Sequence, residues 1–365
     1  MVPAYLVSAV VYGTFFALMA MGLTLTYLTT KVPNFAYGSF VTIGLYSAYQ
    51  LETLNHLSPY AASLVAFVVA GGASVLMYVG ILRPLAKRGT PLVALMIATF
   101  GVDIGFIGVF GIYTDYLQTR YKLIDAKQFF ALPGDFTIFG IQGVVFVAPL
   151  VLVLITVMLF LLFTRTRFGV AMRASVENPP LARVLGINVE RVYTVSWMLA
   201  GGFAGLAGAL YTLWLPGGTS TGSDLIVEIF ASSVLGGLTS IFGAVVGGLV
   251  IGGSEDLVTT GLGEGFGYIG AGLIAVATIL IGVYLFRKRR IGSRIGGAIF
   301  GILGVYIFFE MATGFSTDIL AQGLVSGFGP DVTPFQKGIP LLIMVIALMV
   351  LPQGLISLRF RRKKK

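Results

Sequence analysis

The sequence predicts an all-α protein that crosses a membrane many times, and three observations support this prediction. Of its 365 residues, 57% are apolar and only 11% are charged, and the mean hydropathy is +0.95. A soluble domain could not cover so much apolar surface with polar groups. Apolar stretches of about 20 residues, the length that spans a bilayer as a helix, recur along the whole chain. The apolar surface of this chain is therefore expected to be covered by the lipid bilayer.

Nine apolar stretches between charged loops are expected to cross the membrane as helices. Six of them are residues 4–28, 35–51, 60–82, 92–113, 141–163 and 192–215. Three more, after a glycine-rich region, are residues 267–286, 295–313 and 339–356. No room is left for a large soluble domain. We therefore expect residues 1–365 to form a single transmembrane domain.

The basic residues indicate the orientation of these helices. Twenty of the 24 lysines and arginines fall at Lys31, in the loops 83–88, 165–191 and 287–294, or in the tail 359–365. By the positive-inside rule these segments lie in the cytoplasm, so the C-terminus is expected there and the protein in the cell membrane. The same placement explains the net charge of +9 without nucleic acid as a partner.

The segment 225–253 is predicted to be a broken or re-entrant hairpin. The loops at Arg165 and Arg287 both lie in the cytoplasm, and the spans between them already provide two crossings, so this segment must return to its own side. Two short apolar halves are interrupted by the residues Gly236, Gly237, Thr239 and Ser240. Irregular backbone at membrane depth is tolerated where protein or water surrounds it, which points to a translocation pathway. The alternative is an ordinary kinked span.

Several kinds of chemistry are excluded or disfavoured by composition and motifs. The chain has no cysteine and one histidine, His56, which excludes disulfides and iron–sulfur clusters and disfavours a histidine metal site. It contains neither a phosphate-binding loop nor the HExxH or nucleophile-elbow motif of common hydrolases. We expect no enzyme, no metal and no cofactor on this chain, so the energy for any transport must come from a partner.

The cytoplasmic loop 164–191 has the pattern of a short helix. Asn178 is a favourable N-cap, Pro179 suits the first helical position, and Gly186 can end the helix in a left-handed conformation. Leu181, Val184 and Leu185 would share one face. A helix of about two turns is not stable alone. Its apolar face needs a docked soluble subunit or, as the alternative, an anionic membrane surface.

The chain resembles a known family in three stretches: residues 22–27 with 32–39 and Gly44, the loop 165–188, and the glycine-rich residues 234–248. A weaker fourth stretch is 351–355. On these motifs the chain is similar to the inner-membrane permeases of branched-chain amino-acid ABC importers, a family that also includes permeases for urea and short amides. Two features depart from the pattern: Tyr37 stands where members commonly have histidine, and residues 267–333 look like an insertion with two extra spans.

The resemblance implies a permease subunit that imports branched-chain amino acids or similar small polar solutes. Its partners would be ATPase subunits that bind ATP and Mg, a second permease subunit of the same or a related chain, and an extracytoplasmic solute-binding protein. The resemblance also implies that the loop helix is a coupling helix that sits in a groove of the ATPase. Its residues would be Glu177, Asn178, Pro179, Leu181, Ala182, Leu185 and Gly186.

Candidate residues for the pathway come from the second span and from the broken hairpin. Asn34, Tyr37, Thr239 and Ser240 are expected to line it, with helix N-termini binding a zwitterionic solute. The alternative for each is ordinary hydrogen bonding between helices. Asp103 is the acid that lies deep within a predicted span, so an ion-coupled carrier that uses this carboxylate is the alternative function. Asp103 could instead pair with a neighbouring helix.

Overall fold

The computed structural model describes residues 4–138, 140–263, 338 and 341–345. Nearly all of them belong to one compact unit, Met1–Ser254 with Pro340–Lys365, while a second unit is formed by Glu255–Ile339. The predicted spans 267–286 and 295–313, the proposed insertion 267–333, most of the span 339–356 and the basic tail lie outside the described residues. The account below concerns the first unit and the helix that leads out of it.

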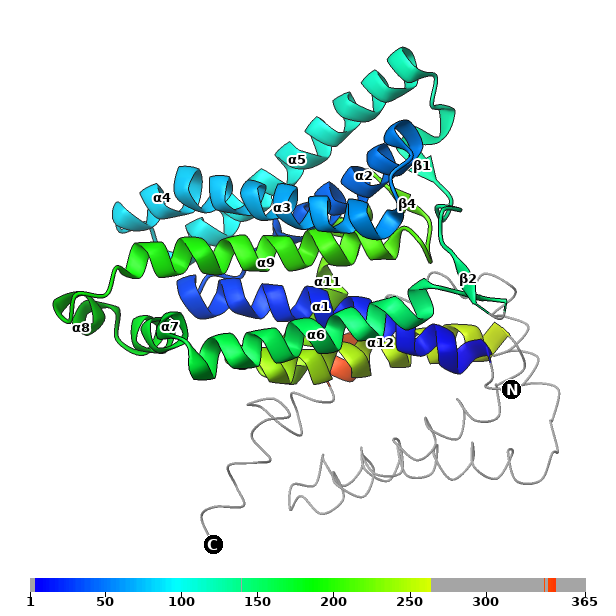
Figure 1. Ribbon diagram of the computed structural model, residues 1–365. Coiled ribbons are helices and arrows are strands. Elements are labelled where there is room, and N and C mark those ends of the chain that lie inside the picture. Colours follow the sequence, from blue (N-terminus) through cyan, green and yellow to red (C-terminus); the bar gives the residue numbers. More distant parts are fainter. Residues whose placement is uncertain (1–3, 139, 264–337, 339–340, 346–365) are drawn as a thin grey trace, which may run out of the picture. The chain divides into compact units, whose positions relative to one another are not determined.

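The described chain is helical, as predicted (Figure 1). The long helices are α1 (Ala4–Thr30), α2 (Tyr37–Asn55), α3 (Pro59–Met77), α5 (Leu92–Tyr121), α6 (Val144–Arg165), α9 (Val189–Tyr211) and α12 (Ile241–Gly263). The short ones are the π-helix η1 (Tyr78–Leu82), α4 (Arg83–Lys87), the 3-10 helix η2 (Ile124–Lys127), α7 (Arg167–Glu177), α8 (Pro179–Val184), α10 (Thr221–Asp224) and α11 (Ile226–Gly236). Among the described residues, five helices are long and apolar enough to cross a membrane. The chain is thus an all-α, multi-pass membrane protein.

The helix ends differ from the predicted spans where polar residues continue a helix or where proline interrupts it. α5 runs to Tyr121, eight residues beyond the predicted end. A hydropathy pattern finds the apolar part of a helix, whereas polar residues can extend it past the hydrocarbon layer. α2 begins at Tyr37 instead of residue 35, because Pro33 and the left-handed Lys31 keep the chain between α1 and α2 out of a helix.

Helix α9 is the centre of the bundle and packs against α1, α2 and α3. Small residues make this possible. A Cβ atom added to Gly44 of α2 would overlap the backbone carbonyl of Gly205 in α9, and one added to Gly205 would meet Ala66 and Ala70 of α3. Backbones this close gain dispersion contacts that larger side chains would prevent. The glycines of the predicted span 192–215 therefore serve helix packing.

The segment predicted to be broken is indeed interrupted. α11 ends at Gly236, Gly237 has φ +94°, and α12 starts at Ile241 with Ser240 as its cap: the Gly243 N–H donates to Ser240 Oγ at 3.2 Å. Gly247 packs against the carbonyl of Ser232, so α11 and α12 run side by side in opposite directions. The two halves are unequal. α11 has 11 residues, but α12 has 23 and continues beyond the expected end at residue 253.

Helix α12 returns along α1 in the opposite direction. Gly248 packs against Ala17, and Gly252 packs against Gly13, four residues nearer the start of α1. Up to Gly253, α12 thus runs toward the end of the bundle at which α1 begins. This arrangement agrees with a hairpin that returns to the side from which it came, as the count of crossings requires.

Small strands, which the sequence analysis did not predict, lie at the end of the bundle opposite α8 (Figure 1). They are β1 (Gln128–Phe129), β2 (Thr137–Ile138), β3 (Ile141–Gln142) and β4 (Gly217–Gly218). β1 pairs with β4 and β2 with β3, both antiparallel. Phe129 stacks on Tyr49 of α2 with ring centroids 4.3 Å apart. These contacts hold the α5–α6 and α9–α10 connections together.

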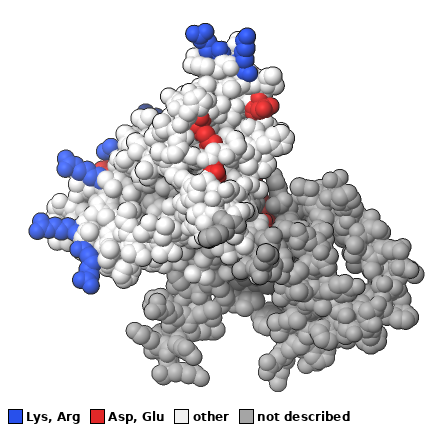
Figure 2. All heavy atoms as spheres, turned by 45° about the vertical axis from the view of Figure 1, so that its right-hand side comes forward, with Lys and Arg blue, Asp and Glu red and all other residues white. Residues whose placement is uncertain are grey.

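Charged side chains are distributed as expected for a membrane protein. On the face in Figure 2, lysines and arginines gather at the end formed by α4 and α8 and where α5 finishes, and the surface between these places is largely free of basic groups. The outward faces of α3, α5 and α6 expose large apolar side chains. Such surfaces suit lipid.

Candidate functional site

The short helix predicted in the loop 164–191 is present as α8. Asn178 caps its start, because Asn178 Oδ1 accepts a hydrogen bond from the backbone N–H of Leu181 at 3.1 Å. Pro179 occupies the first helical position, where a missing N–H costs nothing. Gly186 follows the last turn with φ +81°, which favours glycine. The predicted start and end signals of this helix are confirmed.

Helix α8 exposes three apolar side chains and buries one small one. Leu181, Val184 and Leu185 are 53%, 83% and 69% exposed, whereas Ala182 is 1% exposed. Ala182 therefore faces the rest of the chain and the three larger residues face away from it. A helix of six residues cannot be stable on its own. An apolar face on such a helix is typical of a surface that a partner covers.

The preceding helix, α7, was not predicted. Thr166 caps it, since the Gly169 N–H donates to Thr166 Oγ1 at 3.2 Å, and this threonine followed by an amphipathic segment is the signal that could have revealed it. Glu177, which we expected within the coupling helix, is instead the exposed last residue of α7. The chain bends at Asn178 between the two helices, because the proline that follows disfavours a helical conformation there.

The segments on either side of α8 are joined to helix α9. Asn188, just after α8, caps α9 by accepting a hydrogen bond from the Arg191 N–H at 3.0 Å. The hydroxyl of Tyr193 in α9 donates to the carbonyl of Ser175 in α7 at 3.0 Å. The segments that precede and follow α8 are therefore joined to α9, the helix against which α1, α2 and α3 pack.

Asn34 and Tyr37 are both buried near the start of α2, but they differ in what they can still bind. The Tyr37 hydroxyl donates to the Ala200 carbonyl of α9 at 3.2 Å, so it serves helix packing. Asn34 Oδ1 accepts the Ala36 N–H at 3.1 Å. Within the described part of the chain, Asn34 Nδ2 has no hydrogen-bond partner although the residue is only 1% exposed. Asn34 thus keeps a free donor.

Thr239 and Ser240 lie at the tip of the broken hairpin. Thr239 is exposed, and Ser240 is already occupied as the cap of α12. No hydrogen bond joins these two residues to Asn34 or Tyr37 among the residues that the structure describes. The segment 31–36 instead meets α11 and α5: Phe35 and Phe230 have ring centroids 5.2 Å apart, and the Phe35 N–H donates to Thr99 Oγ1 of α5 at 3.1 Å. The four predicted residues are therefore not gathered into one contact network.

Asp103 is buried in the middle of α5, as predicted. It is 5% exposed, and its Oδ1 accepts hydrogen bonds from Ser39 Oγ at 2.5 Å and from Ser223 Oγ at 3.0 Å. The carboxylate therefore joins α5 to the first turn of α2 and to α10. Neither serine was singled out in the sequence, because three positions so far apart in the chain show no local pattern.

Comparison with known proteins identifies the family. The chain matches a protein-family model over residues 5–286. The family is described as the permease component of the branched-chain amino acid transport system. The chain belongs to this family. One relative is the probable branched-chain amino acid transport permease protein LivH of Methanocaldococcus jannaschii. The two sequences are 42% identical over 283 residues, and this alignment covers 76% of the permease and 89% of that relative. No solved structure matches the permease.

Two further relatives have similar names. The high-affinity branched-chain amino acid transport system permease protein BraD of Pseudomonas aeruginosa is 29% identical over 313 residues, which cover 79% of the permease and 95% of BraD. The high-affinity branched-chain amino acid transport system permease protein LivH of Escherichia coli K12 is 27% identical over 276 residues, which cover 68% of the permease and 83% of that LivH. The family resemblance inferred from the sequence is confirmed: the chain is a transport subunit of an ABC importer and not an enzyme.

The described part of the permease contains no group of three or more His, Asp or Glu side chains that could hold a metal ion. Several of its buried polar groups are bonded to neighbouring helices, as Asp103 and Tyr37 illustrate. The arrangement thus presents two features: an exposed apolar face on α8 and a few polar groups buried within the bundle.

Proposed function

We propose that the permease forms the membrane pathway of an importer for branched-chain amino acids or similar small polar solutes. The relatives described above are all named for branched-chain amino acid transport, and this supports the substrate class. Urea and short amides are the alternative substrates, since Tyr37 occupies the position where the family commonly has histidine. ATP and Mg would be bound by partner ATPase subunits, because the sequence contains no phosphate-binding loop.

The observation that best supports this proposal is the exposed apolar face of α8. In the importer, Leu181, Val184 and Leu185 would fill a groove of the ATPase, while Ala182 keeps α8 seated on the permease. Glu177 at the end of α7 would lie beside this contact. Burial of apolar side chains supplies the affinity, and the capped helix ends fix the geometry.

Motion of α8 would then reach the pathway through α9. The bonds of Asn188 and Tyr193 join the segments on either side of α8 to α9, and α9 touches α1, α2 and α3 along close backbone contacts. Close-packed helices shift as bodies because their interfaces leave little room for side chains to absorb a displacement. Closure of the ATPases would in this way move the start of α2 relative to α11.

The pathway is proposed to run where the start of α2 meets α11. Asn34 has an unbonded Nδ2 there, and the neighbouring rings of Phe35 and Phe230 supply an apolar wall. A branched-chain amino acid needs both kinds of surface, polar for its backbone and apolar for its side chain. The carboxylate of Asp103 in α5 contacts Ser39 in the first turn of α2, and the positive end of the α2 helix dipole there favours a negative charge.

The remaining parts of the importer are also proposals. A second permease subunit, identical or related, would complete the pathway, and a solute-binding protein would deliver the solute on the side opposite α8. The cytoplasmic C-terminus and the two-span insertion 267–333 fall outside the described residues and stay predictions.

A co-purification experiment tests the docking role of α8. The permease is expressed with its ATPase, either unchanged or as L181S/L185S, and the ATPase retained on the tagged permease is measured. We expect strong loss in L181S/L185S and no loss in V170S, a control that removes another exposed apolar side chain from the neighbouring helix α7. Equal retention in all three would contradict the proposal.

An ion-coupled carrier that uses the buried carboxylate of Asp103 is the alternative that the sequence analysis left open. It differs in its energy source from the ABC importer, to whose permease family the chain belongs. Uptake by proteoliposomes that needs ATP and continues without proton or sodium gradients excludes the carrier. Uptake by the purified permease alone, driven by a gradient, would exclude the importer.

A further inference from the structure

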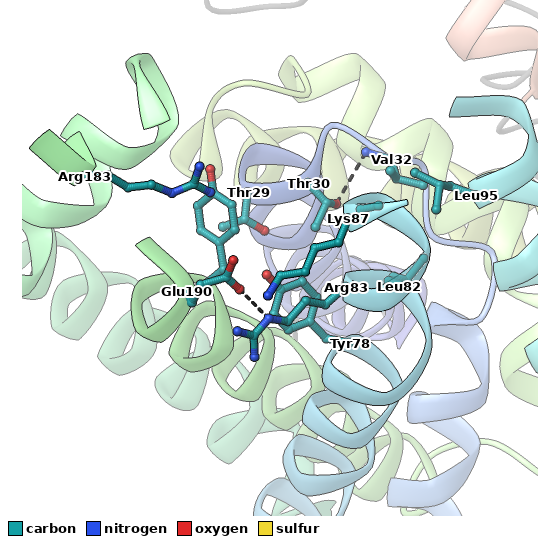
Figure 3. Close-up of a pocket in the computed structure, with 12 residues that line it drawn as sticks. Thr29, Thr30, Val32, Tyr78, Leu82, Arg83, Lys87, Leu95, Arg183 and Glu190 are labelled. Carbon is teal, nitrogen blue, oxygen red and sulfur yellow. Dashed lines mark hydrogen bonds and ion pairs between the residues drawn. The ribbon is translucent and has the colours of Figure 1, made fainter. Parts of the chain in front are cut away.

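A pocket of about 380 Å³ opens beside the coupling helix. It is lined by the end of α1, by η1 and α4, by the start of α5, and by residues of α8 and α9. Figure 3 shows Arg183 of α8 and Lys87 of α4 reaching toward its middle from opposite sides. The pocket therefore lies between the element expected to contact the ATPase and the cytoplasmic end of α3.

The charges in this pocket do not balance. Arg83, Lys87 and Arg183 face one acid, Glu190. Glu190 pairs with Arg83, with Oε2 2.6 Å from Nε. Lys87 and Arg183 form no ion pair within the described part of the chain. Both side chains are exposed to solvent, but two cations that reach into the same pocket still repel one another, and an anion between them relieves this repulsion.

Few of the pocket's neutral donors remain available. Three of its four hydroxyls already donate to backbone carbonyls: Thr29 and Thr30 to Thr26, and Tyr193 to Ser175. The fourth, on Tyr78, has no hydrogen-bond partner among the described residues. A guanidinium, an ammonium and a phenol hydroxyl thus face the same space, and this donor set suits the several oxygens of a phosphate group.

We propose that this pocket binds a phosphate group between Arg183 and Lys87. The pocket lies at the α8 end of the bundle, which the positive-inside pattern places at the cytoplasmic membrane surface, where anionic phospholipid headgroups are abundant. Free phosphate is the other source of the same chemistry. A bound phosphate would connect α8 to α4 and so restrict the coupling helix. This inference does not depend on which solute is transported.

Binding is measured by native mass spectrometry of the full-length permease in non-ionic detergent. The probes are phosphatidylglycerol, phosphatidylcholine, whose choline cancels the phosphate charge, and inorganic phosphate, which is scored by displacement of the lipid. We expect K87Q/R183Q to bind phosphatidylglycerol about tenfold more weakly than the unchanged permease, because charge-assisted hydrogen bonds are lost. The control R88Q/R167Q removes two cytoplasmic charges outside the pocket and should bind as the unchanged permease does.

A second variant, E190Q, is expected to change the affinity for phosphatidylglycerol in the opposite direction. An increase in affinity cannot result from misfolding, so this variant separates the effect of charge from a loss of structure. E190Q releases Arg83 and should strengthen binding of phosphatidylglycerol. Displacement of the lipid by inorganic phosphate would identify free phosphate as a ligand, while no displacement would identify the lipid headgroup; both results support a phosphate site. Equal binding of phosphatidylglycerol by the unchanged permease and K87Q/R183Q, or no binding of phosphatidylglycerol by the unchanged permease, would overturn the proposal.

Discussion

Ser223 Oγ donates a hydrogen bond to Asp103 Oδ1 at 3.0 Å, across 120 residues of sequence. The same oxygen also accepts the hydroxyl of Ser39. A carboxylate within a membrane span is costly unless other groups bond to it. Two hydroxyl donors, together with the first turn of α2, provide that compensation here. Asp103 thereby fixes the start of α2 relative to the segment that leads into α11.

This relationship predicts that Asp103→Asn weakens the bundle without abolishing ATP-driven uptake. The amide oxygen can still accept both hydroxyls, but the hydrogen bonds lose their charge assistance, which costs about 1–2 kcal/mol. Thermal unfolding in detergent measures the loss, and uptake in proteoliposomes with the ATPase measures function.

Asp103→Leu is the informative comparison, because it leaves the buried hydroxyl of Ser39 and the half-buried hydroxyl of Ser223 without this acceptor. It should be clearly less stable than Asp103→Asn. If Asp103→Asn unfolds like the unchanged permease yet transports nothing, the carboxylate acts on the solute or on an ion, and its role as a tie between helices is wrong.

Close packing of α2 on α9 predicts that Gly44→Ala is destabilising. The added methyl group would overlap the carbonyl oxygen of Gly205, so the helices must separate, and overpacking of this kind costs about 1–3 kcal/mol. A lower melting temperature of the purified permease is the expected result.

Gly101→Ala is the matched control for this substitution. Gly101 lies within α5, and a Cβ atom there would meet nothing within 4 Å. Alanine should be neutral or slightly stabilising at this position, because it favours a helix more than glycine does. Equal melting temperatures for the two variants would show that α2 and α9 are not held at this distance.

Local signals allowed much of the fold to be predicted from the sequence. The caps at Asn178 and Gly186 and the break at Gly237 depend on residues close together in the chain, and the structure confirms them. Five of the predicted spans, 4–28, 60–82, 92–113, 141–163 and 192–215, also correspond to helices long and apolar enough to cross a membrane. The extent of α12 was missed because its glycine-rich sequence, with Gly252 and Gly253 at the expected end, resembles a stop signal, whereas these glycines continue as helix.

The candidate site was less predictable, because its contacts connect distant positions. Ser39 and Ser223 meet Asp103 only through the packing of three helices, and Arg83 pairs with Glu190 across more than a hundred residues. Side-chain type alone could not show that Tyr37 is bonded to α9 while Asn34 keeps a free donor. Such differences follow from tertiary geometry, which no local pattern contains.

Capping of α8 predicts that Asn178→Ala weakens binding of the ATPase. The substitution removes the bond to the Leu181 N–H, and loss of such a cap costs a helix about 1 kcal/mol. Because α8 has only six residues, this cost appears as lower affinity for the ATPase, by up to about fivefold. Titration of the detergent-purified permease with its ATPase measures the change.

Asn178→Asp restores an acceptor oxygen and should bind the ATPase nearly as well as the unchanged permease. The melting temperature of the isolated permease should be similar in both variants, since the exposed side of α8 adds little to the bundle. Normal affinity in Asn178→Ala would mean that the ATPase does not recognise α8 as a helix.

The broken hairpin predicts that positions before α11 and after α12 lie on the same side of the membrane. The chain has no cysteine, so single cysteines can report accessibility without background. Cysteine at Ser220, before α11, or at Glu264, after α12, should react with a membrane-impermeant maleimide added to intact cells. Cysteine at the exposed Val184 of α8 should react only after permeabilisation, because the positive-inside pattern places α8 in the cytoplasm. If positions 220 and 264 react from opposite sides, the segment crosses the membrane once, and the basic clusters that follow it would have the reverse orientation.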